Sequence, residues 1–174
     1  MKKTFLLLLI LSLLIISSCG DDAPVPDPST NEGLSGTLTY NGKSFRMKSG
    51  VFASQDDDGD AFAQFFLGDG TVELIEPNTV SFSNNKIEIR MTAVSKGTAS
   101  LENGDYATTT NDPDLYVNLT VTTIEGFNTD TREALANGTV SISGSGNTYS
   151  LTFDVPFEEG VKLTGTVTGT YENP

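Results

Sequence analysis

Apolar and polar residues alternate along most of the chain from residue 34 onward, with a period of two. This alternation is typical of β-strands that bury one face and expose the other. The first two strands are predicted at 34–40 and 43–48, on either side of Asn41-Gly42, a dipeptide that favours two-residue hairpin turns. The turn sets a register in which the apolar positions share one face: Tyr40 opposite Lys43, Leu38 opposite Phe45, and Gly36 opposite Met47.

Two more hairpins are predicted in the first half of the domain. Residues 51–54 and 61–67 alternate around the acidic segment 56–60, which is expected to form the hairpin tip. Residues 79–83 and 86–94 flank a pair of asparagines that is expected to form the next turn. This turn sets two apolar pairs on one face: Phe82 with Ile87, and Val80 with Ile89.

The middle of the domain departs from this alternation. Residues 95–113 are polar, with Leu101 and Tyr106 as apolar anchors, and we expect them to be irregular. The segment exceeds the usual length of a connection, which makes it either a binding loop or a flexible excursion. A long strand is predicted at 114–124. A short helix is predicted at 129–138, where an aspartate is placed to cap the first turn and an Asn-Gly pair to end the last.

The last third of the chain is the most regular, and three strands are predicted at 139–143, 148–157 and 161–171. The first turn, taken as a four-residue loop, pairs Ile142 with Tyr149 and Val140 with Leu151. The second turn gives the following pairs: Phe157 with Val161, Val155 with Leu163, Phe153 with Gly165, and Tyr149 with Gly169. Two aromatic rings thus lie opposite strand glycines, an arrangement that covers the gap at each glycine and allows strong curvature.

These elements together predict an all-β domain. It is an antiparallel meander of about ten strands in sequence order, with at most one short helix. Such a meander closes as an up-and-down, calycin-like barrel or folds over as a β-sandwich. Residues 36–40 and 165–171 read alike, Gly-Thr-Leu-Thr-Tyr and Gly-Thr-Val-Thr-Gly-Thr-Tyr, which indicates that the first and last strands lie side by side. The barrel is therefore favoured over the sandwich.

The N-terminal residues carry a different pattern. Lys2 and Lys3 precede an apolar run at 5–16 that only Ser12 interrupts, and small residues lead up to Cys19. This order is typical of secretory signal peptides. A helix of this run spans about 18 Å, well short of the roughly 30 Å hydrocarbon core of a bilayer. A permanent transmembrane helix is therefore not expected.

Ile16-Ser17-Ser18-Cys19 resembles the lipobox of bacterial lipoproteins, in which the cysteine sulfur receives a diacylglyceryl group and becomes the first mature residue. The resemblance implies a signal peptide at 1–18 and acyl chains such as palmitate on Cys19, which anchor the protein to a membrane. The alternative is an ordinary signal peptide with an incidental cysteine. Asp21 and Asp22 resemble the export signal of lipoproteins that Bacteroidota-type bacteria carry to the outer face of the outer membrane. The alternative is that these two aspartates are only the first residues of a solvated tether.

The chain is accordingly divided into three parts. Residues 1–18 are the signal peptide, and 19–33 are a lipidated tether whose alternating prolines fix an extended backbone. Residues 34–174 form a single β domain. The expected location is the outer membrane, with the lipid-anchored domain at the cell surface and the periplasmic face as the alternative.

Charge and composition limit the partners and the chemistry. Residues 19–174 hold 8 lysine and arginine residues against 23 aspartate and glutamate residues, a net charge of −15, which disfavours nucleic acid or an anionic bilayer as a partner. The sequence has no histidine, and Cys19 is its only cysteine, which excludes histidine triads and cysteine nucleophiles in the domain. Carboxylate pairs remain, but nearly all carboxylates fall in predicted turns. The protein is therefore not expected to be an enzyme.

The acidic segment 56–60 is the sharpest local motif. Asp56, Asp58 and the following glycine match positions three, five and six of an EF-hand calcium loop, whereas position one would be Ser54 and the flanks read as strands. An acidic hairpin turn is therefore the first interpretation, and a calcium site formed by Asp56, Asp58 and Asp60 is the alternative. Apart from the lipid on Cys19, no other cofactor is expected.

The domain carries one early motif, Tyr40-Asn-Gly42, and a late run of three: Gly138-Thr-Val140, Tyr149-Ser-Leu151 and Gly160-Val-Lys-Leu-Thr-Gly165. On these motifs the chain resembles small secreted lipoproteins of Bacteroidota-type bacteria, families that are largely of unknown function. The shared residues are structural, so the resemblance implies a location and a fold and assigns no chemistry.

Three classes of function follow. The first is a non-catalytic module that binds a small ligand, a glycan or a partner protein at the barrel mouth or through the loop 95–113. The second is a structural or assembly lipoprotein of the envelope without a ligand, and the third is a carboxylate-dependent hydrolase. One internal feature separates the first two classes. A cavity favours binding and a filled core favours the structural role, and the side chains concerned are Phe62, Phe66, Phe82, Tyr149 and Phe153.

Overall fold

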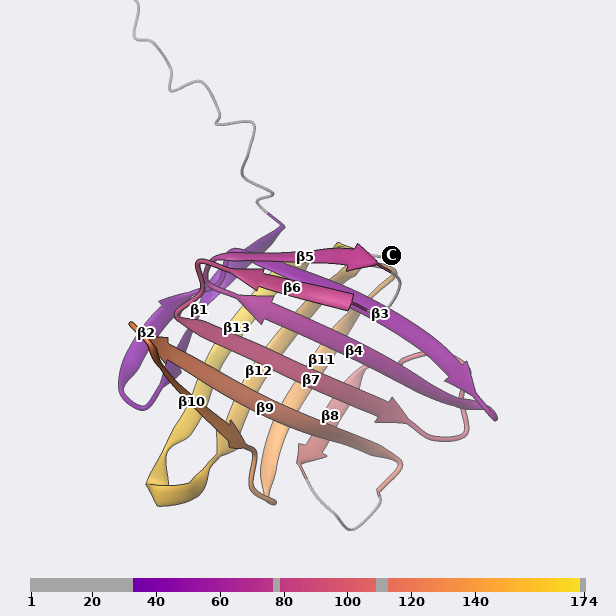
Figure 1. Cartoon of the computed structure of the whole chain (residues 1–174). Helices are drawn as coiled ribbons and strands as arrows, with labels where there is room; N and C mark the ends of the chain where they lie inside the picture. The colour runs from indigo at the N-terminus through magenta and orange to yellow at the C-terminus, as the bar shows by residue number, and fades with distance from the viewer. Residues whose placement is uncertain (1–32, 77–78, 109–112, 173–174) are drawn as a thin grey trace, which may run out of the picture. The chain divides into compact units, whose positions relative to one another are not determined.

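The alternating pattern after residue 33 is realised as β-strands throughout. The computed structural model describes residues 33–76, 79–108 and 113–172, which contain thirteen strands, one 3-10 turn and no α-helix (Figure 1). The elements are β1 (Leu34–Tyr40), β2 (Lys43–Arg46), β3 (Ser49–Asp57), β4 (Asp60–Gly68), β5 (Thr71–Glu76), β6 (Thr79–Ser83), β7 (Ile87–Ser95), β8 (Gly104–Thr108), β9 (Leu115–Glu125), β10 (Asn128–Glu133), β11 (Gly138–Ser145), β12 (Thr148–Pro156), η1 (Glu158–Gly160) and β13 (Lys162–Thr170). The prediction of an all-β domain is confirmed. None of the described residues belongs to a helix long and apolar enough to cross a membrane.

One large sheet holds most of the strands. Its order is β2-β1-β13-β12-β11-β8-β9-β7-β4-β3, and β10 pairs with the C-terminal half of β9. The pairs within this described sheet are antiparallel, apart from β8 and β9, which run parallel. β5 and β6 form a separate hairpin that packs beside β3 and β4. The meander is therefore interrupted twice, by β8 and by the β5–β6 hairpin.

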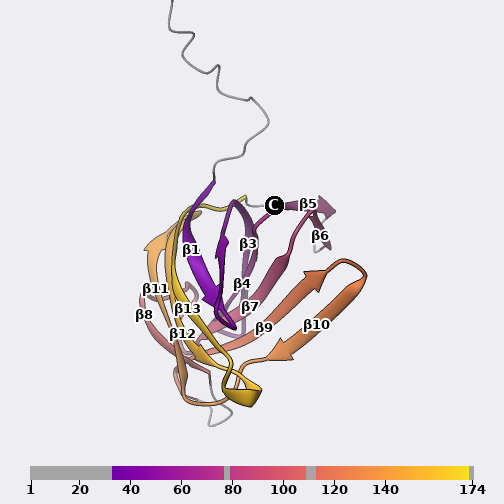
Figure 2. The same ribbon diagram turned by 90° about the vertical axis from the view of Figure 1, so that its left-hand side faces the viewer.

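The large sheet curls into a half-barrel (Figure 2). β1 and β13 are paired along their whole length, so the first and last strands lie side by side as predicted. The rings of Phe153 and Tyr149 lie opposite Gly165 and Gly169, which confirms that part of the predicted register. Gly165 has a φ of 124°, and a Cβ there would stand 2.3 Å from the carbonyl oxygen of Thr37. Only glycine permits this close approach of two curved strands.

Backbone contacts tie the two ends of the sheet together on one side only. The Lys48 N–H, just after β2, donates to the Gly68 carbonyl at the end of β4 (3.0 Å). Glu172, just after β13, forms a parallel bridge with Val51 in β3. β2 itself pairs with β1 alone in the described sheet, and β10 pairs with β9 alone. Both strands therefore keep a free edge, and the mouth of the half-barrel beside them stays open.

The inward faces of the strands form one core. Phe65 lies within it, with its ring centroid 4.9 Å from that of Phe52, 5.3 Å from Tyr149 and 5.4 Å from Tyr171. These four side chains are at most 6% exposed. Offset and edge-on aromatic contacts of this kind stabilise a core beyond the area that they bury. The interior of the half-barrel is therefore filled by side chains.

The first two predicted hairpins are confirmed. β1 and β2 pair Tyr40 with Lys43 around a turn in which Asn41 and Gly42 have φ values of 48° and 71°. β3 and β4 meet at the acidic tip, in the register that sets Asp57 opposite Asp60. In both cases the turn residues tolerate positive φ, which is the conformation that a two-residue hairpin turn requires.

The predicted helix at 129–138 is wrong. Residues 128–133 form β10, which pairs with β9 around the turn Gly126-Phe127. Gly126 has a φ of 65°, as a tight hairpin turn requires, and Thr122 and Thr131 hydrogen-bond across the pair (3.0 Å). Local capping signals were outweighed by this pairing, because a strand beside β9 satisfies more backbone groups than one exposed helical turn.

The predicted pairing of 79–83 with 86–94 is also wrong. β6 pairs with β5, and β7 lies between β4 and β9 in the large sheet. The buried Asn85 side chain holds this arrangement: its Oδ1 accepts from the Gly70 N–H (2.7 Å), and its Nδ2 donates to the carbonyls of Thr71 (2.9 Å) and Ser83 (3.0 Å). The Asn85 side chain thus links the turn before β5 to the end of β6 by hydrogen bonds, and Asn85 is not part of a hairpin turn.

Two further predictions need correction. β11 and β12 are joined by a two-residue turn, so that Ile142 lies opposite Leu151 and Val140 opposite Phe153. The predicted four-residue loop placed each partner two positions away. Residues 95–113 are not irregular throughout, because 104–108 form β8 between β9 and β11. Strand residues with weak alternation can join a sheet when both neighbours supply hydrogen bonds.

Two buried tyrosines differ in how their hydroxyl groups are satisfied. The Tyr106 hydroxyl donates to the Glu102 carbonyl (2.6 Å) and lies 2.6 Å from Ser95 Oγ, which anchors the segment before β8 as predicted. Burial raises the pKa of the Tyr106 phenol, and its hydrogen bonds act in the opposite direction. Burial also raises the pKa of Tyr171, whose hydroxyl has no hydrogen-bond partner in the described part of the chain.

Candidate functional site

The acidic residues Asp56, Asp58 and Asp60 lie at the tip of the β3–β4 hairpin. Asp56 Oδ1 accepts a hydrogen bond from the Gly59 N–H (3.0 Å), and Asp60 Oδ1 accepts one from the Gly97 N–H (2.8 Å). These two carboxylates therefore serve backbone groups of turns. Among residues 33–76, 79–108 and 113–172, no three histidine, cysteine or carboxylate side chains come close enough to hold a metal ion. The acidic turn is thus observed, and the calcium alternative stays a prediction.

The residues of the predicted lipid anchor lie outside the described part of the chain. They are Cys19, Asp21 and Asp22, together with the signal peptide 1–18 and all but the last residue of the tether 19–33. Lipidation and export therefore stay predictions from the sequence.

The aromatic residues proposed to line an internal cavity do not share one. Phe153 and Tyr149 belong to the filled core. Phe62 and Phe66 alternate with buried residues of β4 and so point to the opposite face of the sheet, where Phe66 meets Phe82 with ring centroids 6.4 Å apart. The open mouth of the half-barrel, and not its interior, offers room for a ligand.

A pocket of about 700 Å³ lies at this mouth. It is bounded by the β1–β2 hairpin, by the turns that precede β5 and β7, and by the β9–β10 hairpin, whose turn lies near the β1–β2 end of the domain in Figure 1. The lining residues are Tyr40, Asn41, Lys43, Ser44, Phe45, Arg46, Lys48, Asp69, Lys86, Thr123, Ile124, Glu125, Asn128, Thr129, Asp130 and Arg132. The volume is within the range of sites that hold small ligands. The acidic tip of β3 and β4 lies at the opposite end of the domain.

The pocket gathers most of the positive charge of an acidic domain. From residue 33 to the C-terminus the sequence has 8 lysine and arginine residues and 19 aspartate and glutamate residues. Five of these basic residues line the pocket: Lys43, Arg46, Lys48, Lys86 and Arg132. Three acidic residues line it: Asp69, Glu125 and Asp130. A domain with a net charge of −11 thus contains a pocket with a net charge of +2.

One ion pair spans the pocket. The Lys43 ammonium on β2 pairs with the Glu125 carboxylate at the end of β9, and so joins the two hairpins that form opposite walls. Both side chains are more than half exposed. Exposed ion pairs of this kind contribute about 0–1 kcal/mol to stability, so this contact holds the two hairpins together only weakly.

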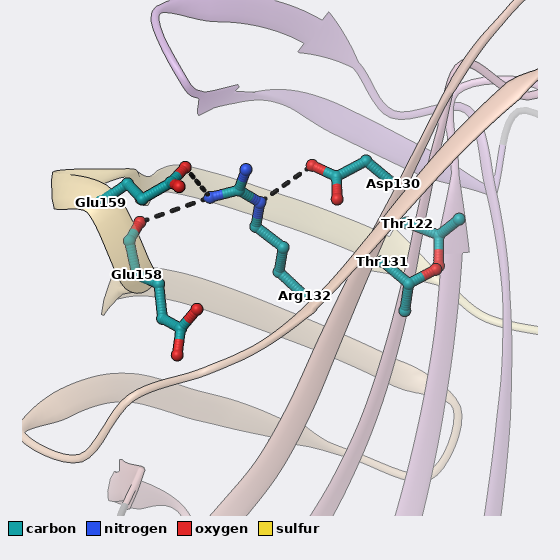
Figure 3. Close-up of polar contacts among 6 residues, drawn as sticks. All are labelled: Thr122, Asp130, Thr131, Arg132, Glu158 and Glu159. Atoms are coloured by element: carbon teal, nitrogen blue, oxygen red, sulfur yellow. Dashed lines mark hydrogen bonds and ion pairs between the residues drawn. The ribbon is translucent and has the colours of Figure 1, made fainter.

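Arg132 on β10 is held by a second group of acceptors (Figure 3). Its Nε donates to Asp130 Oδ2 (2.9 Å), and its Nη1 donates to Glu159 Oε2 (2.9 Å) in the turn η1. Nη1 also lies 3.5 Å from the Glu158 carbonyl oxygen. The hydrogen bonds to Asp130 and Glu159 raise the pKa of the guanidinium above its usual value. Arg132 therefore ties β10 to the turn between β12 and β13.

The carboxylates of the pocket are all engaged, whereas three of its cations are not. Asp69 Oδ1 accepts from the Lys86 N–H (2.7 Å) and from the Ile87 N–H (3.1 Å), which fixes the start of β7. Glu125 and Asp130 are paired as described above. In the described part of the chain, no ion pair engages the side chains of three exposed residues, and they are Arg46, Lys48 and Lys86.

Two aromatic residues, Tyr40 and Phe45, line the pocket, and a third, Phe127, lies in the turn between β9 and β10. Tyr40 is buried, with its ring edge-on to Phe157 at a centroid distance of 5.3 Å. Burial raises the pKa of its phenol, and the charge of Arg132 acts in the opposite direction. Phe45 is half-buried against the core, and Phe127 is fully exposed at the β9–β10 tip. Phe127 is not one of the lining residues, so the rings that line the pocket are buried or half-buried.

The sequence analysis named the barrel mouth as a candidate binding place but did not identify the residues of this pocket. One signal was visible: Lys43, Arg46 and Lys48 stand within six residues of each other in an otherwise acidic domain. Lys86 and Arg132 come from distant parts of the chain, and only the curl of the sheet brings them to the same mouth.

Comparisons of this chain with protein-family models, with curated proteins and with solved structures gave no match. The function is therefore argued from the residues and the geometry of the domain itself.

Proposed function

We propose that this protein is a membrane-anchored bacterial lipoprotein whose β domain is a non-catalytic binding module. The ligand site is the pocket at the open mouth of the half-barrel. The observation that carries the proposal is the concentration of unpaired cations in a concave site of about 700 Å³ within an acidic domain. Charges are distributed this way where a ligand is recognised, because like charges brought together without a partner repel each other.

The anchor is supported by the N-terminal sequence. The lipobox-like Ile16-Ser17-Ser18-Cys19 supplies a cysteine for acylation, and two or more acyl chains make membrane attachment stable. Asp21 and Asp22 support export to the outer face of the outer membrane, with the periplasmic face as the alternative.

A structural lipoprotein without a ligand is the second candidate. The filled interior favours it, since Tyr149 and Phe153 belong to the packed core and leave no shared cavity with Phe62 and Phe66. A carboxylate-dependent hydrolase has weaker support, because Asp69, Glu125 and Asp130 are each engaged by donors in the pocket. The two leading candidates differ in whether the pocket binds anything.

A titration separates these candidates. We expect that at least one of four probes shifts the backbone amide resonances of pocket residues such as Ser44, Lys86 and Thr129. The probes are hexagalacturonate, maltohexaose, an acidic decapeptide and a neutral decapeptide of the same length. Residues of the acidic tip at the other end of the domain serve as the internal control. If no probe moves the pocket resonances, the ligand-free structural role replaces the binding role.

The anchor is tested by a separate experiment with Cys19→Ala. We expect the native protein to sediment with membranes and the Cys19→Ala protein to be soluble, because the thiol is the acylation site. Protease treatment of intact cells then locates the domain. Its release from intact cells indicates the cell surface. Protection until the outer membrane is opened indicates the periplasmic face. Membrane attachment of Cys19→Ala would contradict the lipid anchor.

A further inference from the structure

We infer that the ligand of this pocket is an extended peptide segment with at least two carboxylates, which adds to the free edge of β2. The inference rests on the proposed binding function and names the ligand class. Three observations carry it: unpaired cations on separate elements, a free strand edge along the pocket, and the burial or half-burial of the two aromatic rings that line it, Tyr40 and Phe45.

The cations require an anionic ligand. Arg46 is the last residue of β2, Lys48 follows it after Met47, and Lys86 lies just before β7. A single carboxylate carries one negative charge against these three unpaired cations. A segment with two or more carboxylates matches their charge more closely. Charge-assisted hydrogen bonds to carboxylates are stronger than neutral ones, and an arginine can bind a carboxylate through two of its N–H groups.

The rest of the domain limits the length of that anion. Outside the pocket the domain is strongly acidic, so a long polyanion would meet repulsion wherever it left the site. Charges separated by more than about 8 Å are largely screened at physiological salt. A short acidic segment is therefore attracted by the pocket and only weakly repelled by the surrounding surface.

The edge of β2 supplies backbone hydrogen bonds. Tyr40 and Lys43 flank a two-residue turn and so form a hydrogen-bonded pair, which directs the backbone groups of Ser44 and Arg46 away from β1. Met47 fits this alternation, because its N–H again donates to β1 (3.0 Å). All four residues of β2 line the pocket, whereas a pocket on one face of a strand would touch alternate residues only. The pocket therefore runs along the strand edge, where an extended peptide can pair.

The aromatic residues favour a peptide over an acidic sugar. A sugar ring is usually bound by stacking on an exposed aromatic face. Tyr40 is 4% exposed and packed against Phe157, so its ring is not available. Phe45 is half-buried, and the exposed Phe127 does not line the pocket. The half-buried Phe45 ring suits an apolar side chain that alternates with the carboxylates of an extended segment.

Isothermal titration calorimetry of the purified full-length protein tests the charge requirement. The probe is a decapeptide of alternating threonine and glutamate, and the neutral control peptide has glutamine in place of glutamate. We expect the acidic peptide to bind and its Kd to rise by about tenfold or more in the double variant Arg46→Gln/Lys86→Gln. The matched control Arg90→Gln/Lys162→Gln removes the same charge outside the pocket, and its Kd should change by less than about twofold.

A second variant tests the strand edge without a change in charge. Ser44→Pro removes an N–H that points away from β1, so the β1–β2 pairing is retained, as is usual for proline in an edge strand. We expect Ser44→Pro to raise the Kd of the acidic peptide by about tenfold, and Ser44→Ala to change that Kd by less than about twofold. An unchanged urea unfolding midpoint confirms that both variants are folded.

Several outcomes would overturn the inference. One is the absence of measurable binding of the acidic peptide at about 1 mM, and another is equal binding of the glutamine peptide. If hexagalacturonate or maltohexaose binds in the pocket and the acidic peptide does not, the proposed binding function is retained and the inference of a peptide ligand is wrong. If Ser44→Pro binds as tightly as the native protein, pairing with the β2 edge is wrong. If no probe titrates the pocket, both the inference and the proposed function fail.

Discussion

Gly165→Ala is expected to lower the free energy of unfolding by at least about 3 kcal/mol. Gly165 lies in β13 between β12 and β1, with a φ of 124° that L-residues rarely adopt. A Cβ at this position would stand 2.3 Å from the Thr37 carbonyl oxygen and 3.2 Å from the Leu38 Cα. Both atoms belong to β1, so β1 must move away from β13 to make room for the methyl group.

The urea unfolding midpoint measures this effect, and Gly160→Ala is the matched control. Gly160 also has a positive φ, 74°, but no atom lies within 4 Å of the Cβ that alanine would add. Its cost should be about 1–2 kcal/mol, the penalty for the left-handed backbone alone. If the two substitutions cost the same, close strand approach at Gly165 does not hold the curl of the sheet.

Phe65→Ala is expected to cost about 3–5 kcal/mol, the range for removal of a large aromatic ring from a packed core. The Phe65 ring is fully buried and contacts Phe52, Tyr149 and Tyr171. These partners come from β3, β12 and the segment after β13, so the loss would loosen the two halves of the curled sheet at once. A cavity there cannot collapse easily, because the surrounding rings are rigid.

Phe127→Ala provides the contrast, because the Phe127 side chain is fully exposed at the β9–β10 tip. Its substitution should change the free energy of unfolding by less than about 0.5 kcal/mol. Both variants are compared by urea unfolding with circular dichroism. A loss below about 1 kcal/mol for Phe65→Ala would show that the aromatic cluster repacks and does not hold the two halves together.

Several local features of the fold were predictable from residue type. Asn41-Gly42 and Asp58-Gly59 have the positive φ values that two-residue turns require; the β1–β2 hairpin has the predicted register, and β3 and β4 meet at the predicted acidic tip. Glycines opposite aromatic residues predicted the curvature of the last three strands. These predictions succeed because turn geometry and side-chain alternation are set within a few residues of each other.

The errors concern segments whose partners lie far away in the chain. Residues 129–138 have helix-capping signals, yet the first part of this segment pairs with β9. β8 has weak alternation and becomes a strand because β9 and β11 lie on either side of it. Asn85 reads as a turn residue, but its side chain is buried between two turns. In each case long-range hydrogen bonds decided between local alternatives of similar free energy.

The sequence by itself determined the strand-rich fold class, the principal turns and the side of each confirmed strand that faces the core, because these depend on alternation and on turn residues. The lipid anchor predicted at Cys19 likewise rests on the sequence alone. Only the tertiary structure decided the strand order, the open mouth and the pocket. Arg46 and Lys86 are forty residues apart in the chain, and they line one pocket because the sheet curls and leaves β2 with a free edge. No local pattern encodes that proximity, since it arises from pairing between strands that are distant in sequence.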